Sequence, residues 1–260
     1  MHLLSPTDLS PDRRRSRRHR FYRNLLLLDL FILGCLSLPA PFNRLAHLVY
    51  GLLLLILSLQ LRETLRPGGR RSNDLAFRLV GLACLLSMVF WSFTPLEVRN
   101  SGLPLLLLIT GFIAWSLQRL ILFLSEEKLI NQKVLMGAVA GYLLLGLTAG
   151  MVVTVLETLQ PGSFISASDQ KPLILPGPTS SLEVPWNLNF VRLTYYAFVC
   201  ITTVGFGDIL PQTPAAQMFT VLFTVVGPLY IAVVMGILIS RLTVQESEVQ
   251  KSHPPLRDDP

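Results

Sequence analysis

The stretch that decides the fold runs from residue 202 to residue 208 and reads Thr202-Thr203-Val204-Gly205-Phe206-Gly207-Asp208. It lies between two apolar segments and contains few side chains that could carry out chemistry, so its useful atoms are expected to be backbone oxygens. Glycine at positions 205 and 207 permits positive φ, which lets successive carbonyls point to one side of the chain. Four copies around a symmetry axis would replace the water shell of a dehydrated cation, and the Thr203 hydroxyl would add an oxygen ring at the inner end.

The apolar segments around this stretch differ in length. Residues 189–201 form an apolar, aromatic run of about 13 residues, which is too short for a bilayer core that needs roughly 20. This run is therefore predicted to be a re-entrant helix. Residues 215–242 follow a polar link and are long and apolar enough to span a membrane. Because another apolar segment lies at 134–159, the order is spanning helix, outer loop, half-helix, glycine-containing stretch and spanning helix.

The composition of the chain excludes a soluble globule. Of its 260 residues, 51% are hydrophobic and 15% are charged, and its mean hydropathy is +0.54. Such a chain has too little polar surface for a soluble protein of this size. The formal net charge of +6 does not indicate nucleic-acid binding, because the basic residues cluster beside apolar segments. The three cysteines form no spaced pair, so neither a disulfide framework nor a metal site is predicted.

Six apolar segments are predicted to span the membrane. They are residues 21–39, 46–61, 75–93, 103–124, 134–159 and 215–242. From Arg13 to Arg23 the chain carries seven arginines, which are repelled from hydrocarbon and attracted to the anionic lipids of an inner leaflet. With this end inside, 18 of the 22 lysines and arginines lie at or near the cytoplasmic side, as the positive-inside rule requires. This orientation places both termini in the cytoplasm and residues 202–208 at the outer face.

The five residues from Thr203 to Gly207, Thr-Val-Gly-Phe-Gly, resemble the signature of potassium channels, with phenylalanine where tyrosine is commoner. With its order of segments, the chain resembles the six-segment members of the voltage-gated-like cation-channel superfamily, of the prokaryotic type. Close resemblance covers only residues 134–242, and the first four segments match in number and order alone. The resemblance implies an all-α membrane protein with six transmembrane helices, and a re-entrant pore helix and selectivity filter between the fifth and sixth. It also implies a homotetrameric pore, because the filter string occurs once and a single copy cannot surround an ion.

This topology divides the chain into five parts. They are a basic cytoplasmic tail (1–20), a four-helix sensor-like domain without a charge ladder (21–124), a cytoplasmic linker (125–133), a pore module (134–242) and a short cytoplasmic tail (243–260). The linker is either an interfacial segment that acts on the gate, as in the resembled family, or a solvated loop. The external loop at 160–188 either shapes access to the pore or is a plain connection. The last tail is too short for a folded regulatory domain.

The first four segments depart from a voltage sensor. A sensor requires several arginines or lysines at every third position of the fourth helix, whereas residues 103–124 contain only Arg119. Steep voltage gating is therefore not expected. Arg78 and Arg119 lie near inner ends, where a long side chain can reach the interface. Asp29 is closer to mid-membrane, so it either pairs with a neighbouring helix, through Arg119, or faces a small wet crevice.

The resemblance assigns ion contacts to the selectivity filter. Permeant K+ is expected to bind the backbone carbonyls of Thr203, Val204, Gly205, Phe206 and Gly207 and the Thr203 hydroxyl. Asn187 or Asn189 can cap the pore helix, whose C-terminal end then points at the inner cavity. That end carries roughly half a negative charge, which favours a cation there.

Three residues of the pore helix are expected to support the filter from behind. Tyr195 and Tyr196 form an aromatic cuff, and one of their hydroxyls is expected to bond Asp208. Val199 stands where some similar channels have a glutamate. With Val199 apolar and Phe206 lacking a hydroxyl, the filter is expected to have few polar struts.

The last apolar segment contains Gly227-Pro228 where the resembled family has its hinge glycine. Proline removes a backbone donor and clashes with the preceding turn, so a bend is expected. The bend is either a gating hinge or a fixed kink. Gly236 permits close helix approach or a second flexing point.

The predicted function is passive conduction of potassium through a homotetramer. An enzyme is not predicted, because the chain has no nucleophile with a partnered base, no metal-ligand cluster and no phosphate-binding glycine loop with a lysine. The expected partners are the bilayer and anionic lipids at the basic tail, without nucleic acid and without a cofactor beyond permeant K+. The expected location is the plasma membrane of a prokaryote. The alternatives are a less selective cation channel, a non-conducting accessory subunit and a component of a potassium transporter.

Overall fold

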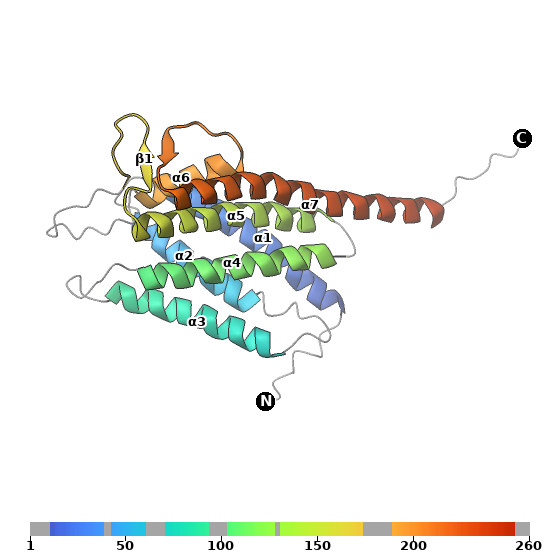
Figure 1. Ribbon diagram of the computed structural model, residues 1–260. Helices are drawn as coiled ribbons and strands as arrows, with labels where there is room; N and C mark the ends of the chain where they lie inside the picture. Colours follow the sequence, from blue (N-terminus) through green and yellow to red (C-terminus); the bar gives the residue numbers. More distant parts are fainter. Residues whose placement is uncertain are drawn as a thin grey trace, which may run out of the picture.

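The computed structural model describes residues 11–38, 43–60, 71–93, 103–127, 131–173 and 189–252. In these residues the chain forms helices and one short two-stranded sheet (Figure 1). The helices are α1 (Pro11–Leu36), α2 (Asn43–Gln60), α3 (Arg71–Phe93), α4 (Leu103–Glu126), α5 (Gln132–Leu159), α6 (Asn189–Ile201) and α7 (Pro214–Ser252). The strands are β1 (Phe164–Ser166) and β2 (Ile209–Pro211).

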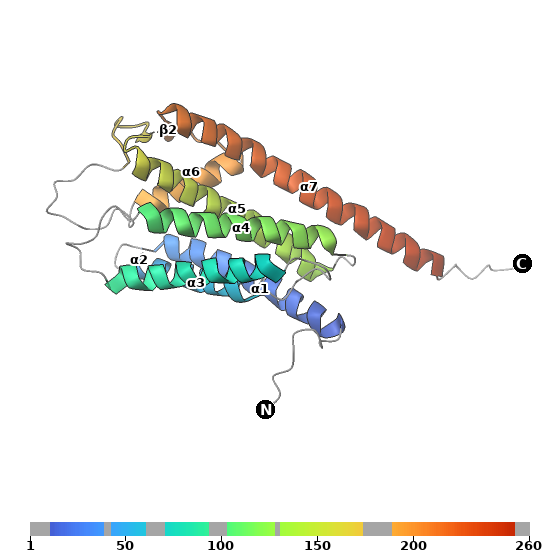
Figure 2. The same cartoon turned by 60° about the horizontal axis from the view of Figure 1, so that its bottom comes forward.

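Helix α5 lies at the centre of the molecule. It packs against α1, α4, α6 and α7, and α4 and α6 lie on opposite sides of it in both views (Figures 1 and 2). Of its apolar span, 72% is buried inside the protein, against 28% for α7. Helices α2 and α3 join the bundle through α1 and α4. The pore module and the four-helix domain of one chain are therefore in direct contact along α5.

Three helices of the described residues are long and apolar enough to cross a membrane: Leu103–Ser125, Gln132–Leu159 and Pro214–Val244. They coincide with the fourth, fifth and sixth predicted spans. The first three predicted spans are also helical, but among the described residues α2 and α3 offer only the shorter apolar stretches Tyr50–Leu59 and Leu75–Phe90. The chain is thus a multi-pass membrane protein, and six spans stay a prediction.

Several predicted boundaries shift in the structure. Helix α1 begins at Pro11, so it includes the basic run that was expected to be a tail, and proline is favoured at such a first helical position. Helix α7 continues to Ser252, beyond the predicted end at 242, and stays helical through Pro228. Helix α6 has the predicted bounds and 13 residues.

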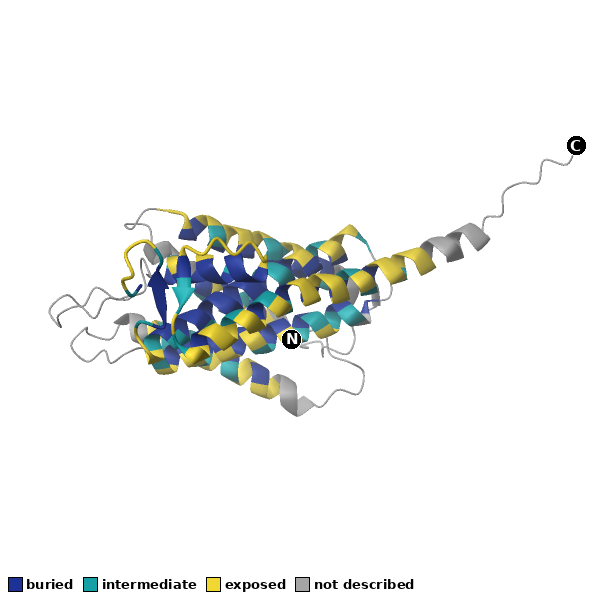
Figure 3. Cartoon of the chain, turned by 45° about the horizontal axis from the view of Figure 1, so that its top comes forward, coloured by how far each residue is buried: buried dark blue, intermediate teal, exposed yellow. Residues whose placement is uncertain are grey.

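The outer face of α7 and the residues after α6 are exposed in the single chain. Figure 3 shows exposed residues along α7, the helix that leads to the C-terminus. Large apolar side chains lie there, including Met218, Val221, Leu222, Val225, Leu229 and Val233. Residues 202–208 are exposed as well. An apolar surface of this size on a membrane helix is available to lipid or to another copy of the chain.

Gly227 lies where α7 passes under the end of α6. A methyl group at this position would lie 2.0 Å from the carbonyl oxygen of Ile201, and backbone atoms cannot move aside as a flexible side chain can. This glycine therefore allows close helix packing, whatever it does as a hinge. The hinge role predicted for Gly227 and Pro228 stays a prediction.

We expect Gly227→Ala to lower the melting temperature of the purified protein in detergent, because overpacking costs about 1–3 kcal/mol. Gly111→Ala is the matched control, since a methyl group at 111, also inside a helix, would meet no atom within 4 Å. Thermal unfolding followed by tryptophan fluorescence measures both. Equal melting temperatures for the two variants would contradict the packing role.

Candidate functional site

The backbone of residues 202–208 alternates in conformation. Positive φ values occur at Thr203 (60°), Gly205 (58°) and Gly207 (73°), and not at the residues between them. Alternation of this kind turns successive peptide planes so that their carbonyls point to one side. The predicted positive φ at the two glycines is confirmed.

Thr203 has a conformation that the sequence did not predict. A β-branched residue with positive φ is an outlier that costs of order 1–3 kcal/mol, and such strain persists only where surrounding structure enforces it. The only sequence feature that could have indicated positive φ at residue 203 is its spacing. Residue 203 continues the two-residue period of Gly205 and Gly207. A glycine here would relieve the strain but would remove the hydroxyl at the inner end of the filter.

The C-terminal end of α6 binds the backbone donors of the filter. The N–H groups of Val204 and Gly205 donate to the carbonyl of Val199 at 3.1 and 3.4 Å. The N–H of Thr203 donates to the Cys200 carbonyl at 3.0 Å, and that of Thr202 donates to the Phe198 carbonyl at 3.0 Å. Within the described part of the chain, no backbone N–H reaches the carbonyls of residues 203–207. These carbonyls are therefore exposed and available to a ligand.

The inner end of α6 is fixed by α5. The hydroxyl of Tyr142 donates to the Ile201 carbonyl at 3.1 Å. Close approach of the two helices depends on Gly146, because a methyl group there would lie 2.3 Å from the Phe198 ring. The last carbonyls of a helix lack intrahelical partners, so the Tyr142 hydroxyl satisfies one of them and sets the depth of the filter.

The outer end of the filter is held by the small sheet. Strands β1 and β2 are antiparallel, with Ile165 opposite Leu210. The Ala167 N–H donates to the Asp208 carbonyl at 2.9 Å, and the Gln212 N–H donates to the Ser163 carbonyl at 2.8 Å. The chain after α5 and the chain after the filter are thus bonded to each other.

Glu157 anchors this sheet to α5. Its side chain is fully buried, and its two oxygens accept the N–H groups of Gly162 and Phe164, each at 2.9 Å. A carboxylate that accepts two backbone N–H bonds fixes the turn that leads into β1. We did not predict this role from the sequence. The available signal was an acidic residue inside the apolar span, one turn before Pro161-Gly162.

The two predicted support tyrosines have different contacts. The ring of Tyr195 stacks on Phe206, with centroids 6.4 Å apart and planes 7° apart, and its hydroxyl interacts with Asp208. The hydroxyl of Tyr196 instead bonds that of Thr220 of α7 at 2.7 Å. Its ring also packs edge-on against Phe164 of β1. Tyr195 therefore contacts Phe206 and Asp208, and Tyr196 joins α6 to α7. Support of the filter by these two tyrosines stays a prediction.

A cavity of about 210 Å³ lies beside the filter, and Val199 forms part of its wall. Thr203, Asp208, Thr220 and Thr224 also line it. Among its lining residues, Asp208 is the only acidic one. Polar side chains of Thr203, Asp208, Thr220 and Thr224 share this wall with Val199, and the expected shortage of polar struts stays a prediction.

Asp29 and Arg119, the charged residues considered as a pair within the first four helices, lie in different surroundings. Arg119 lies over the ring of Phe77, 4.3 Å from its centroid, and 5.4 Å from the Trp115 centroid. Asp29 is fully buried, and neither carboxylate oxygen has a hydrogen-bond partner in the described residues. Its neighbour is the buried hydroxyl of Tyr50. Among the described residues Asp29 thus does not pair with Arg119, and that interpretation was wrong because it considered charge alone. The small wet crevice stays a prediction.

Some predicted features lie outside the described residues. These include Asn187 and the part of the external loop from residue 174 to residue 188. Asn189 is the first residue of α6, but its side chain is not described. The cap of the pore helix therefore stays a prediction.

Part of the chain is similar to known proteins. Residues 141–244 match the family model described as "Ion channel". A segment of 96 residues is 26% identical to the Drosophila melanogaster protein named "Potassium voltage-gated channel protein eag". It covers 37% of this chain and only 8% of that relative. No solved structure matches the chain. The matched region is an ion-channel segment rather than part of an enzyme, as predicted.

We expect Glu157→Gln to loosen the turn before β1, because an amide nitrogen would then face a backbone N–H. Hydrogen bonds to a charged group are worth about 1.5–3 kcal/mol, so amide exchange in residues 160–166 should accelerate about 10–100-fold. Hydrogen-exchange mass spectrometry of the intact protein measures this rate.

Asp169→Asn is the control for this prediction. Asp169 is an exposed loop carboxylate, and the N–H of Lys171 lowers its pKa below the usual value. Its replacement leaves the contacts of Glu157 in place. Because Asp169 bonds the Ser166 side chain, the two variants are compared over residues 160–165, where Asp169→Asn should not change exchange. Equal exchange in both variants would exclude an anchoring role for Glu157.

Proposed function

We propose that four copies of this chain form a pore that conducts potassium passively and selectively across a membrane. One observation carries this proposal: the carbonyls of residues 203–207 are exposed without backbone partners, while the neighbouring N–H groups donate to α6. Carbonyl oxygens arranged in this way replace the hydration shell of a cation when several chains surround an axis. The matched ion-channel family supports the same interpretation.

The tetramer places the exposed surface of the single chain at its centre. Residues 202–208 and the large apolar residues of α7 are exposed in the single chain. Burial of these residues between copies covers the surface and brings the carbonyls to a common axis. The C-terminal ends of four α6 helices then favour a cation beneath the filter.

The choice of potassium rests on the filter string and on the distant relative. The relative's printed name contains both potassium and voltage gating, but only the first is proposed here. Helix α4 has Arg119 as its one basic residue, and a single charge moved across 100 mV contributes about 2.3 kcal/mol. We therefore propose weak or no dependence on voltage. We also propose a plasma-membrane location in a prokaryote, with cytoplasmic termini and anionic lipids at the basic end of α1.

The test is the reversal potential of the purified protein in planar bilayers with opposed potassium and sodium gradients. We expect reversal near the potassium equilibrium potential. Gly205→Ala should abolish this potassium-selective reversal, because alanine at φ 58° costs roughly 1–2 kcal/mol and turns a carbonyl away from the axis. Current without selectivity would widen the proposal to cations in general. Absence of current under all conditions would favour a non-conducting accessory subunit.

A second measurement concerns the stability of the filter. Because Val199 is apolar and Phe206 has no hydroxyl, we expect current to decline rapidly when external potassium is lowered. Phe206→Tyr should slow this decline several-fold by adding one hydrogen-bonding group. Phe206→Leu is the control, since it removes the ring that stacks on Tyr195 and should accelerate the decline. Identical time courses in the three proteins would contradict this account of the filter.

A further inference from the structure

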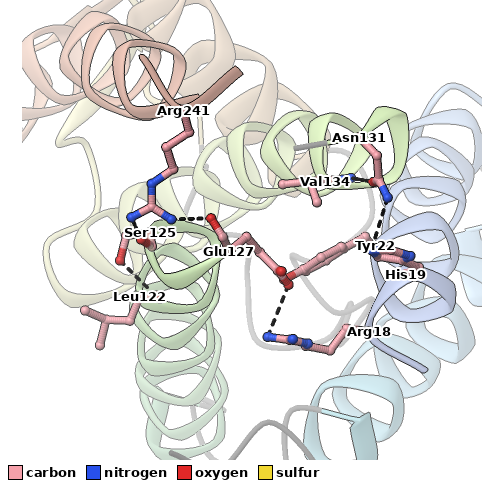
Figure 4. A network of polar contacts seen from close by, with 9 residues as sticks. All are labelled: Arg18, His19, Tyr22, Leu122, Ser125, Glu127, Asn131, Val134 and Arg241. Atoms are coloured by element: carbon pink, nitrogen blue, oxygen red, sulfur yellow. Dashed lines mark hydrogen bonds and ion pairs between the residues drawn. The ribbon is translucent and has the colours of Figure 1, made fainter. Parts of the chain in front are cut away.

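The inner end of the bundle, opposite α6 and the sheet, contains a polar network (Figure 4). Helix α4 ends there at Glu126, and α5 begins at Gln132. Arg241 of α7 extends across to this point and donates to the carbonyls of Ser125 and Glu127. The last carbonyls of a helix have no intrahelical partners and carry partial negative charge. A guanidinium fork therefore binds the end of α4 favourably.

The side chain of the same Glu127 is held by α1. Its Oε1 atom lies 3.2 Å from Nη1 of Arg18 and accepts a hydrogen bond from the Tyr22 hydroxyl at 3.1 Å. Glu127 is only 4% exposed, whereas the Arg18 side chain is 32% exposed, so water reaches this ion pair from the arginine side. The residue is thus bound through its backbone by α7 and through its side chain by α1.

The other end of the same connection is also attached to α1. Asn131 caps α5, because its Oδ1 accepts the N–H groups of Lys133 and Val134 at 3.1 and 3.2 Å. Its Nδ2 lies 3.4 Å from the ring nitrogen of His19. Both ends of the short connection between α4 and α5 therefore rest on the basic end of α1.

The position of α4 sets the direction in which Arg241 holds α7. Helix α4 lies on the side of α5 away from α6 (Figures 1 and 2). In the proposed tetramer the filter and α6 face the central axis, so α4 lies toward the periphery. A bond from Arg241 to the end of α4 thus restrains the inner end of α7 away from the axis.

We infer that Arg18, Tyr22, Glu127 and Arg241 form a latch that keeps the inner ends of α7 apart and the pore open. This inference rests on the proposed tetrameric pore. The latch has two steps in series: α1 fixes the connection through the Glu127 side chain, and the connection fixes α7 through backbone carbonyls. Release of either step lets the inner ends of α7 converge. The basic end of α1 is thereby coupled to the gate.

The first test is single-channel open probability in planar bilayers. Glu127→Gln breaks the ion pair and leaves the carbonyls that Arg241 binds, whereas Arg241→Gln breaks the second step. Each variant should lower open probability about tenfold. Because the steps act in series, the double variant should resemble the single variants and not show a hundredfold loss, as residues in one network are non-additive.

Charge exchange and a matched control separate the latch from a general effect of charge. Arg18→Glu alone should lower open probability, and the combination of Arg18→Glu with Glu127→Arg should restore it. Arg23→Gln is the control, because Arg23 lies on the same helix, is exposed and carries the same charge. It should leave open probability unchanged. Failure of the exchanged pair to recover, or an equal loss in Arg23→Gln, would overturn the latch.

A distance measurement tests the latch without relying on conduction. Spin labels at Thr243, which is exposed on α7, report distances between the inner ends of the four copies by pulsed electron paramagnetic resonance. Glu127→Gln and Arg241→Gln should shorten these distances. Unchanged distances in a protein that conducts would overturn the latch and keep the proposed function. Shortened distances in a protein that does not conduct would support the latch and count against the conducting pore.

Discussion

The C-terminal end of α6 determines where the candidate site can be. It accepts the N–H groups of residues 202–205, so the peptide planes of the filter turn their carbonyls away from the helix. Carbonyls without partners are costly in a membrane interior, and these must therefore face water, an ion or a shared axis. This single requirement accounts for the alternating φ values, for the strained conformation of Thr203 and for the exposed side of the single chain.

Helix α5 holds the filter from both ends. Tyr142 binds the last carbonyl of α6 on the inner side, and Glu157 fixes the turn that leads into the sheet on the outer side. These two residues are four turns apart on one helix, so the length of α5 defines the span within which α6 and the filter fit. The central, largely buried position of α5 follows from these contacts on several faces.

Much of the pore module could be predicted from the sequence because its signals are local. The glycine spacing predicted positive φ at 205 and 207, and the short apolar run predicted α6 with its correct bounds. The contacts of Glu157 and Arg241 could not be predicted, because their partners are backbone groups that have no sequence pattern. Charge matching instead suggested that Asp29 pairs with Arg119, whereas that arginine lies over the rings of Phe77 and Trp115. The position of Asp29 along its segment likewise did not predict that its side chain is fully buried.

The connection from Glu126 to Gln132 spans six residue steps, which reach at most about 20 Å even when fully extended. A connection this short confines the four-helix domain to the α5 of its own chain, where α1 and α4 already pack. In the proposed tetramer each copy would therefore be a self-contained sector, with its own filter segment, outer sheet and inner contacts. In a tetramer built from two different chains, each copy would keep its own internal contacts. Gating of the channel would then change stepwise with the number of copies of each chain.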